Sequence, residues 1–333
     1  PCHSFVYTGQ HNAVQSVLFT FNFTCMKTQL ISCKYLFTSI TACLLFATVS
    51  LAQKNGILPL TGMKFFNEGI AAGNIDIKID GAQLLNNRIP LNKEIEIRLQ
   101  QATGFTADNA KTMFAGAEVI VLSSRGEVLM NNPNVCLKGY SNGFTAKDLA
   151  AFSIKFGIGT DLVKTNPIGI LKVRLYDLKG KSQLRLELPV SFARPGEPLL
   201  LSKNAKSIKS NAGVNGIING LEAKDMLVNV DTTIKVSPKM AYTSMDISNI
   251  EGSSLSEIFS GKETFWVYDS DMNEVKITDI HLKKVKGAME NNSVNCTLKI
   301  PYRLKTNTTK LYTVRYRWEG AIKSQVIDVV VRN

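Results

Sequence analysis

The feature that most constrains the fold of this chain is a period-two alternation of apolar and polar residues, interrupted by turn residues. In residues 74–80 isoleucines occupy every second position, and residues 95–99 repeat the pattern. Successive side chains of a strand point to opposite faces, so each segment presents one apolar face. Turn residues return roughly every ten positions, which is typical of an all-β sandwich or barrel.

Two hairpins follow from the same pattern. Residues 118–122 run into Ser-Ser-Arg-Gly and return at 128–130, and residues 171–175 run into Asp-Leu-Lys-Gly and return at 184–188. Glycine-bearing turns between alternating segments predict β-hairpins. Pro189 lies near the end of the second hairpin, where a missing N–H is tolerated.

One short helix is predicted between strands. Thr145 can cap its N-terminus, and Asp148 lies three residues later, near the positive end of the helix dipole. Leu149, Ala150 and Phe152 then supply apolar side chains. A connector of one or two turns satisfies this pattern.

The second half of the sequence resembles the first. Residues 113–119 (Met-Phe-Ala-Gly-Ala-Glu-Val) align with residues 258–264 (Ile-Phe-Ser-Gly-Lys-Glu-Thr) at a shift of 145. Further along, 171–174 (Leu-Lys-Val-Arg) align with 312–315 (Tyr-Thr-Val-Arg). The matches keep the same order, which indicates an internal duplication.

Each repeat holds about seven short strands in roughly 110–130 residues, the strand number and size of an immunoglobulin-like sandwich. The chain thus resembles tandem immunoglobulin-like or fibronectin-like β-sandwich secreted bacterial proteins. The Cys…Trp…Cys pattern of antibody domains is absent, so the resemblance is to a class. We predict an all-β protein with β-sandwich domain 1 in residues 60–194, a linker rich in Lys, Ser, Asn and Gly in 195–220, and β-sandwich domain 2 in 221–333.

Residues 26–52 have the features of a secretory signal peptide. Lys27 and Lys34 supply positive charge, and residues 35–51 are uncharged and mostly apolar. Ala52 ends a Ser-Leu-Ala tripeptide whose small residues suit signal peptidase, so cleavage is predicted after it. The protein is then expected to be exported to the periplasm, the cell surface or the exterior, with no stable membrane span after cleavage.

Two alternatives remain for this segment. Residues 35–51 are long enough for an uncleaved anchor at the lower limit of about 17–25 residues. Residues 40–43 (Ile-Thr-Ala-Cys) resemble a lipobox, which would place a lipid on Cys43, although the apolar stretch continues well past it. Residues 1–25 contain neither Met nor a charged side chain, and we interpret them as upstream, non-native sequence.

The distribution of charge limits the classes of partner that the chain can bind. The whole chain carries a net charge of +12, and residues 1–52 hold two lysines and no acids. The excess of positive charge is diffuse, whereas a nucleic-acid binder concentrates it on one face, so no nucleic-acid partner is expected.

Only Cys136 and Cys296 follow the signal segment, which is too few for a disulfide framework. Either one bridge or two separate thiols fits the sequence.

No catalytic constellation is recognisable. His281 is the one histidine after the signal segment, and it lies in an alternating strand-like stretch without a nucleophile motif. Zinc is excluded on ligand count. Glu118 and Glu263 occupy matching places in the two repeats, so as a carboxylate pair they would have to meet at a domain junction. We therefore predict that the protein is not an enzyme.

One loop offers oxygen ligands. Asp269, Asp271 and Asn273 occupy alternate positions, which suits Ca²⁺. The loop lacks the glycine and the final glutamate of a helical calcium loop, and the same residue types favour ordinary turns. A weak calcium site and a plain turn are both retained, and no other cofactor is predicted.

An aromatic pair offers the other candidate site. Trp266 and Tyr268 alternate with Phe265 and Val267, so the two pairs lie on opposite faces of one strand. If Trp266 and Tyr268 are exposed, they form a platform for a ligand; if they are buried, they pack in the core.

Taken together, the sequence favours a non-catalytic exported binding, adhesion or scaffold protein of the bacterial cell envelope or secreted fraction, with an envelope protein or glycan as partner. The first alternative is an accessory carbohydrate- or peptide-binding protein that uses the exposed aromatic strip on domain 2. The second is a hydrolase with a carboxylate pair at the domain junction. A scaffold predicts an open edge strand or a self-association patch.

Overall fold

The computed structural model describes residues 55–136, 141–163, 166–210, 214–221, 227–229, 241–251, 260–275, 277–278, 283–285, 289–290, 293–304, 313–322 and 324–332. The chain divides into two compact units, residues 1–51 and 52–333, and every described residue belongs to the second. The signal segment and its cleavage residue Ala52 lie outside the described residues. Among the described residues, no helix has the length and apolar character needed to cross a membrane.

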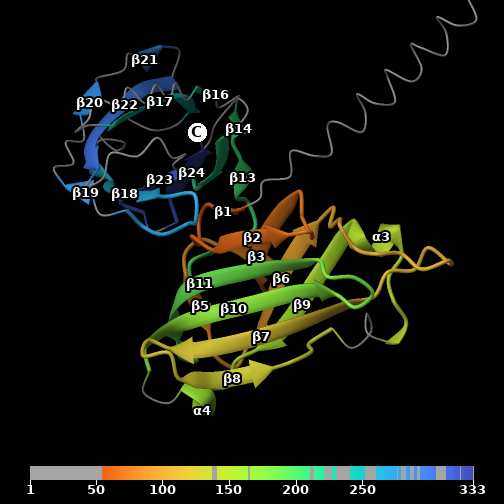
Figure 1. Ribbon diagram of the computed structural model, residues 1–333. Helices are drawn as coiled ribbons and strands as arrows, with labels where there is room; N and C mark the ends of the chain where they lie inside the picture. The colour runs from red at the N-terminus through yellow and green to blue at the C-terminus, as the bar shows by residue number, and fades with distance from the viewer. Residues whose placement is uncertain are drawn as a thin grey trace, which may run out of the picture. The chain divides into compact units, whose positions relative to one another are not determined.

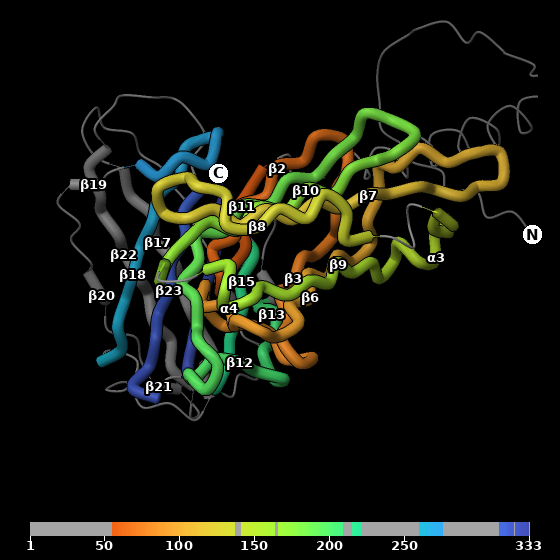
Figure 2. The backbone as a smooth tube through the Cα atoms, turned by 90° about the horizontal axis from the view of Figure 1, so that it is seen from below, coloured from red at the N-terminus to blue at the C-terminus, as the bar shows by residue number. Residues whose placement is uncertain are grey.

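The chain is mostly β, as the alternation predicts. A first sheet has the strand order β1 (Asn55–Ile57), β2 (Lys64–Glu68), β11 (Gln183–Ala193), β10 (Ile168–Asp177), β7 (Ala115–Ser123) and β8 (Val128–Asn132), and β5 (Arg88–Pro90) pairs in parallel with β11. A second sheet has the order β12 (Leu201–Ser202), β4 (Ala82–Leu84), β3 (Asn74–Ile79), β6 (Glu94–Gln100) and β9 (Ala151–Gly157). These two sheets form two layers (Figures 1 and 2).

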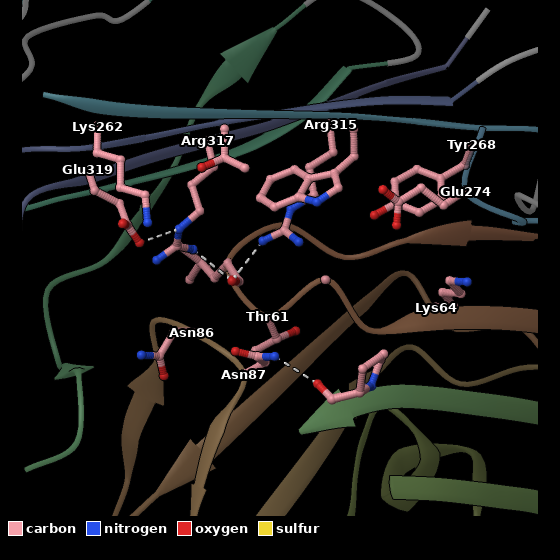
Figure 3. Close-up of a pocket in the computed structure, with 15 residues that line it drawn as sticks. Thr61, Lys64, Asn86, Asn87, Lys262, Tyr268, Glu274, Arg315, Arg317 and Glu319 are labelled. Atoms are coloured by element: carbon pink, nitrogen blue, oxygen red, sulfur yellow. Dashed lines mark hydrogen bonds and ion pairs between the residues drawn. The ribbon is translucent and has the colours of Figure 1, made fainter. Parts of the chain in front are cut away.

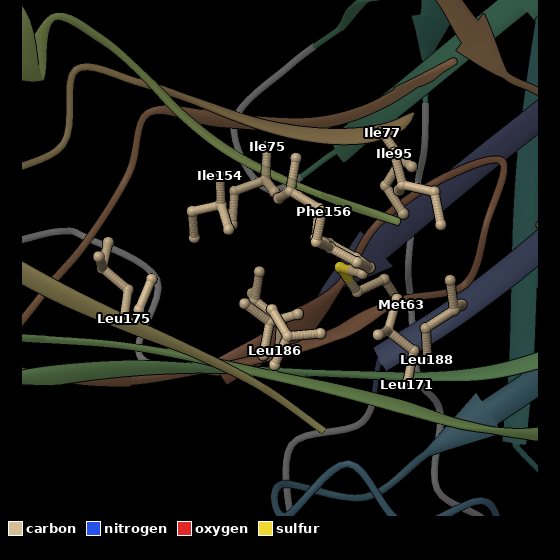
Figure 4. Close-up of a cluster of buried hydrophobic side chains, with 14 of the residues drawn as sticks. Met63, Ile75, Ile77, Ile95, Ile154, Phe156, Leu171, Leu175, Leu186 and Leu188 are labelled. Carbon is tan, nitrogen blue, oxygen red and sulfur yellow. The ribbon is translucent and has the colours of Figure 1, made fainter. Parts of the chain in front are cut away.

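The apolar faces of the two layers meet in one core (Figure 4). Ile77, Ile97 and Ile154 stand side by side on β3, β6 and β9, and all three are buried. Leu171 and Leu186 face them from β10 and β11. Burying such faces is the main favourable contribution to folding, at roughly 25 cal/mol for each Å² of apolar surface removed from water.

The predicted hairpins and helix are present. Strands β7 and β8 form the first hairpin, and β10 and β11 form the second. Helices α3 (Ala146–Leu149) and α4 (Thr160–Val163) have four residues each. In α3 the Thr145 side chain accepts from the N–H of Asp148, and the Asp148 carboxylate accepts from the N–H of Thr145. This reciprocal cap is the one that the sequence predicts.

The described strands of the second half form two more sheets. The third sheet has the order β13 (Lys206–Ser207), β15 (Val214–Asn219), β24 (Val326–Arg332), β23 (Thr313–Glu319) and β18 (Lys262–Tyr268). The fourth has the order β14 (Lys209–Ser210), β16 (Leu227–Asn229), β17 (Ala241–Glu251), β22 (Ser293–Leu304) and β19 (Ile277–Thr278), with β20 (Lys283–Val285) and β21 (Met289–Glu290) also on β22.

The segment predicted as a linker, residues 195–220, contains short strands. Strand β12 completes the second sheet, and β13 and β14 join the third and fourth sheets. Ile217 and Ile218 on β15 are buried. Apolar side chains in an otherwise polar segment therefore draw it into the folded part of the chain.

The described strands of the two halves follow the same order. In the first sheet β2, β11, β10 and β7 are consecutive neighbours, and in the third sheet β15, β24, β23 and β18 are consecutive neighbours. In each set the early strand lies beside the last strand of its half. That last strand lies beside the strand that precedes it in the chain, which in turn lies beside an earlier strand.

The core predicts a large effect of truncating Ile97. This side chain is fully buried between two other isoleucines, so Ile97→Ala is expected to lower the free energy of unfolding by about 2–5 kcal/mol through lost burial and a cavity. Urea denaturation measures the change. Ile168→Ala is the matched control, because Ile168 is 52% exposed. Equal losses for the two variants would contradict the assignment of the core.

Candidate functional site

The most unusual feature of the third sheet is a buried carboxylate held by two arginines. Asp328 on β24 is fully buried, and Arg315 and Arg317 on β23 are 6% and 5% exposed. Arg315 donates from Nε and Nη2 to the two Asp328 oxygens at 3.0 and 2.7 Å, and Arg317 donates from Nη1 at 3.1 Å. The β23–β24 register places Arg317 directly opposite Asp328, and Arg315 lies two residues away on the same face.

The arginines also bind main-chain carbonyl groups of the first half. The Leu60 oxygen accepts from Arg315 Nη2 at 2.9 Å and from Arg317 Nη1 at 2.7 Å. The Leu85 oxygen accepts from Arg317 Nη2 at 2.8 Å. We call this set of contacts among Arg315, Arg317, Asp328, Leu60 and Leu85 the arginine clamp. It fastens two segments that are more than 230 residues apart in the chain.

The loop that presents the Leu60 carbonyl needs a special backbone. Leu60 and Gly62 both have positive φ, 66° and 74°, and the Gly62 N–H closes the turn on the Leu58 oxygen at 3.1 Å. A β-carbon at Gly62 would lie 2.2 Å from Arg315 Nη1. Glycine therefore fits here both because of its conformation and because the guanidinium passes so close.

The environment favours the charged form of Arg315. Burial opposes this charge, but the adjacent Asp328 carboxylate and Tyr268 together outweigh that effect and raise the pKa of Arg315 above its ordinary value. Buried ions cost several kcal/mol each unless they are paired and hydrogen-bonded. In the clamp the carboxylate accepts three N–H groups, and the two main-chain carbonyls take further donors.

Two small apolar clusters flank the clamp. One contains Ile57, Tyr268, Met272 and Val330. The other contains Leu60, Leu85, Ile217 and Val326. Each cluster combines residues of the first half with residues of the second, so apolar contact accompanies the polar clamp and keeps water away from it.

A cleft of about 490 Å³ lies beside the clamp (Figure 3). The third sheet forms one wall, and the loop of residues 60–64, the Asn86–Asn87 turn and Pro189 form the other. The side chains that give it its chemical character are those of Lys64, Asn86, Lys262, Thr264, Trp266 and Glu274. Trp266 is half-buried, and the Arg315 guanidinium lies 4.6 Å from the centroid of its ring. A cation over an indole face is favourable and fixes the ring.

The predicted aromatic pair is divided in the structure. Trp266 and Tyr268 share one face of β18, as the alternation predicts, and both line the cleft. Tyr268, however, is only 5% exposed and packs against Ile57. The pair is therefore not an exposed strip, because the first half covers the tyrosine.

Burial also affects the ionisation of Tyr268. Removal of its hydroxyl group from water raises the pKa of Tyr268 to about 12, and the Glu274 and Asp328 carboxylates act in the same direction. The positive charge of Arg315 and a hydrogen bond with it act in the opposite direction.

The loop proposed for calcium forms a compact turn. The Asp269 Oδ1 atom accepts from the N–H groups of Asp271 and Asn273, each at 2.9 Å, and Oδ2 accepts from the Asn273 side chain at 3.3 Å. These contacts are those of a turn stabilised by its first side chain. Among the described residues, no group of three or more His, Cys, Asp or Glu side chains is placed to hold a metal ion.

The other residues singled out from the sequence are spread apart. The Glu118 carboxylate accepts from Arg174 Nε at 2.9 Å, and the Glu263 carboxylate accepts from the Tyr316 hydroxyl at 2.7 Å. Cys136 is half-buried. His281 and the side chain of Cys296 lie outside the described residues.

Sequence reasoning missed the arginine clamp. Its signal was an acid, Asp328, inside the apolar run Val-Ile-Asp-Val-Val-Val. The alternation of side chains along β23 puts Arg315 and Arg317 on one face, opposite Val314, Tyr316 and Trp318. No pattern near these residues in the sequence indicated that the loop around Leu60 covers the face of β23 that carries the two arginines.

No protein-family model matches the chain, and no curated protein is significantly similar to it.

Asp328→Asn tests the clamp. The neutral amide would leave the buried Arg315 guanidinium without its counter-charge and Arg317 with Glu319 alone, so the free energy of unfolding should fall by about 3–5 kcal/mol. The matched control is Glu118→Gln, which removes the carboxylate of the more exposed pair with Arg174 and should cost less than about 1 kcal/mol. Chemical denaturation of both variants gives the comparison, and a loss for Asp328→Asn no larger than that of the control would disprove the energetic role of the clamp.

Tyr268 predicts a dependence of stability on alkaline pH. Its pKa is about 12 in the folded chain and about 10 in the unfolded chain. The neutral phenol therefore contributes stability below pH 10, and that contribution is lost as the pH rises from 10 to 12, up to about 2 kcal/mol. Stability should fall more steeply over this interval in the native chain than in Tyr268→Phe. Parallel curves from denaturation at each pH would argue against a buried hydroxyl group.

Proposed function

We propose that the protein is an exported, non-catalytic binding protein of the cell envelope, and that the cleft beside the arginine clamp binds a glycan. The observation that carries the proposal is the position of Trp266, half-buried in the cleft and surrounded by amide, hydroxyl and charged side chains from both halves of the chain. A concave site with an aromatic surface and a few convergent polar groups is the usual form of a small-ligand site.

The chemistry of the walls suits a sugar. Sugar rings combine apolar C–H faces with hydroxyl groups, and an indole ring offers a flat apolar surface that can contact such a face. Asn86, Thr264 and Glu274 can exchange hydrogen bonds with hydroxyl groups. Trp266 is held in place by the Arg315 guanidinium before any ligand arrives, so little side-chain freedom is lost on binding.

The charges of the cleft favour an acidic glycan. Among the described residues, neither Lys262 nor Lys64 forms an ion pair. The carboxylate of Glu319 is engaged by Arg317 at 2.7 Å, so Glu274 is the remaining acid of the cleft lining. A glycan that carries carboxylate groups would complement this excess of positive charge.

We also propose that the two halves are duplicated immunoglobulin-like units. Matching strand order supports this interpretation, and so do two hairpin turns. Ser123 Oγ accepts from the N–H groups two and four residues later, and Asp269 Oδ1 does the same. Each turn has a positive φ three residues after its first residue, 85° at Gly126 and 62° at Met272.

Export rests on the charged start and apolar stretch of residues 26–52. A binding protein of the envelope would have ready access to surface glycans. The diffuse positive charge of the chain, +12 overall, would add a loose attraction to anionic envelope polymers.

Titration with oligosaccharides tests the function. The full chain is titrated with oligogalacturonate, which is acidic, and with a neutral cello-oligosaccharide of equal length, and intrinsic tryptophan fluorescence is recorded. Trp266 lines the cleft and Trp318 is 2% exposed, so a spectral change on binding should come from Trp266. Acidic oligosaccharide should bind at least about tenfold more tightly than neutral, because one added ion pair contributes about 1.4 kcal/mol in such a setting.

Lys262→Ala should abolish most of that preference. Lys181→Ala is the control, because Lys181 is an exposed lysine outside the cleft lining, and it should bind like the native chain. Absence of a fluorescence change with either oligosaccharide at millimolar concentration would count against a glycan site.

A further inference from the structure

We propose that a polar pocket on the outer face of the second sheet binds a neutral sugar ring. This inference goes beyond the acidic glycan proposed for the cleft and does not depend on it, because the pocket and the cleft share no lining residue. The observation that carries it is a half-buried carboxylate, Asp76, that holds three side-chain amides in one orientation.

The pocket has a volume of about 310 Å³ and is bounded by two parts of the chain. One part is the outer face of β3, β4 and β6, and the other is residues 202–207 together with Ile217. Ser202 lies opposite Gln83 in the β12–β4 pairing, and Ala205 packs against the apolar cluster that contains Ile217. Main-chain pairing and apolar contact therefore fix both parts, as expected of a preformed ligand site.

Asp76 fixes the orientation of the three amides. Its Oδ2 atom accepts from Asn74 Nδ2 at 3.1 Å and from Gln100 Nε2 at 3.4 Å, and its Oδ1 atom accepts from Gln83 Nε2 at 3.3 Å. An ionised carboxylate only accepts hydrogen bonds, so each amide must turn its NH₂ group toward Asp76. Each amide oxygen is then left for another donor, and no described residue donates to any of the three.

Two lysines add donors to the same pocket. Lys78 and Lys203 both line it, and among the described residues neither forms an ion pair. Ser202 and Ser207 also line it, and a hydroxyl group both donates and accepts. The pocket therefore offers acceptors and donors together, with no aromatic side chain among its described lining residues.

Partial burial strengthens this chemistry. Removal from water raises the pKa of the Asp76 carboxyl above its ordinary value, whereas the hydrogen bond from Asn74 and the charges of Lys78 and Arg98 act in the opposite direction. Hydrogen bonds to a ligand in such surroundings compete less with water than they would on an open surface.

A neutral ring with several hydroxyl groups is the ligand that this arrangement favours. A cation would be attracted by Asp76 and the amide oxygens but repelled by two ammonium groups, and an anion would be repelled by the carboxylate and the amide oxygens. A hydroxyl group donates to an amide oxygen and accepts from an ammonium group, so it matches both. A sugar ring presents such groups on every side.

Saturation-transfer NMR of the full chain tests the ligand class. The probes are the methyl α-pyranosides of glucose, galactose and mannose, with choline as a cation and acetate as an anion. Saturation should reach the ring protons of at least one pyranoside with a dissociation constant of about 1–10 mM, which corresponds to a few net hydrogen bonds without an aromatic contact. No transfer to any pyranoside at concentrations well above that range overturns the proposal, and so does binding of choline or acetate that the pyranoside displaces.

Gln83→Leu removes one amide at nearly constant size, so the dissociation constant for the pyranoside should rise about three- to tenfold. The matched control is Gln183→Leu, because Gln183 is also a half-buried strand residue whose amide donates to a carboxylate, that of Glu68, outside the pocket. The control should bind like the native chain. An equal loss in both variants would show an effect through folding and overturn the assignment.

Lys203→Ala supplies a second variant at an exposed position, where truncation leaves the core intact. It should weaken pyranoside binding at least about threefold, whereas Lys206→Ala, which changes an exposed lysine outside the pocket lining, should not. In the fluorescence titration with oligogalacturonate, Gln83→Leu and Lys203→Ala should both behave like the native chain, because neither residue lines the cleft. A parallel loss in that titration would place the pyranoside in the cleft and overturn the pocket, while failure of the titration in the native chain would bear on the cleft alone.

Discussion

The buried carboxylate of Asp328 is the constraint on which the contact between the two halves depends. A carboxylate without water needs donors, and here three N–H groups from Arg315 and Arg317 supply them. The arginines in turn need more acceptors than one carboxylate can offer, and the Glu319 carboxylate and the carbonyl groups of Leu60 and Leu85 supply them. The apolar clusters beside the clamp could contact many surfaces, whereas the clamp accepts only a partner with two carbonyl groups at these positions.

Strands β10 and β11 of the first half carry a different arrangement of charges. If Gly126 and Met272 occupy equivalent positions in the two hairpin turns, the strand pairings place Arg174 opposite Arg185 where the second half has Arg317 opposite Asp328. In the first half Arg174 bonds a glutamate on the neighbouring strand and stays exposed. The same sheet position thus carries exposed ion pairs in one half and a buried clamp in the other. Replacing one basic residue by an acidic one and covering the surface with a loop would turn such a charged surface into an internal contact.

The sequence predicted what depends on neighbouring residues, namely the alternating strands, the two hairpins and the Thr145 cap. It did not determine the register of the proposed repeat. Matching Glu118 with Glu263 aligns Val119 with Thr264, yet Val119 is buried while Thr264 lines the cleft. If the two hairpin turns are equivalent, the alignment moves by one residue and brings Val119 onto Phe265, which is also buried. Because the period of a strand is two, a slip of one residue exchanges its faces, and identical glycines and glutamates in the sequence could not reveal that.

The clamp and the cleft are structurally linked because both include Arg315. Its guanidinium bonds Asp328 and Leu60 with its edge and covers the Trp266 ring with its face. Long-range contacts also determine how exposed the two aromatic side chains are. Ile57 removes Tyr268 from water, and the polar wall of the first half leaves Trp266 partly exposed. The alternation of β18 could place the two rings on one face, but which ring stays partly exposed is determined by residues some 200 positions away. The cleft therefore exists only where the halves are joined, and the buried charge that joins them also orients its aromatic ring.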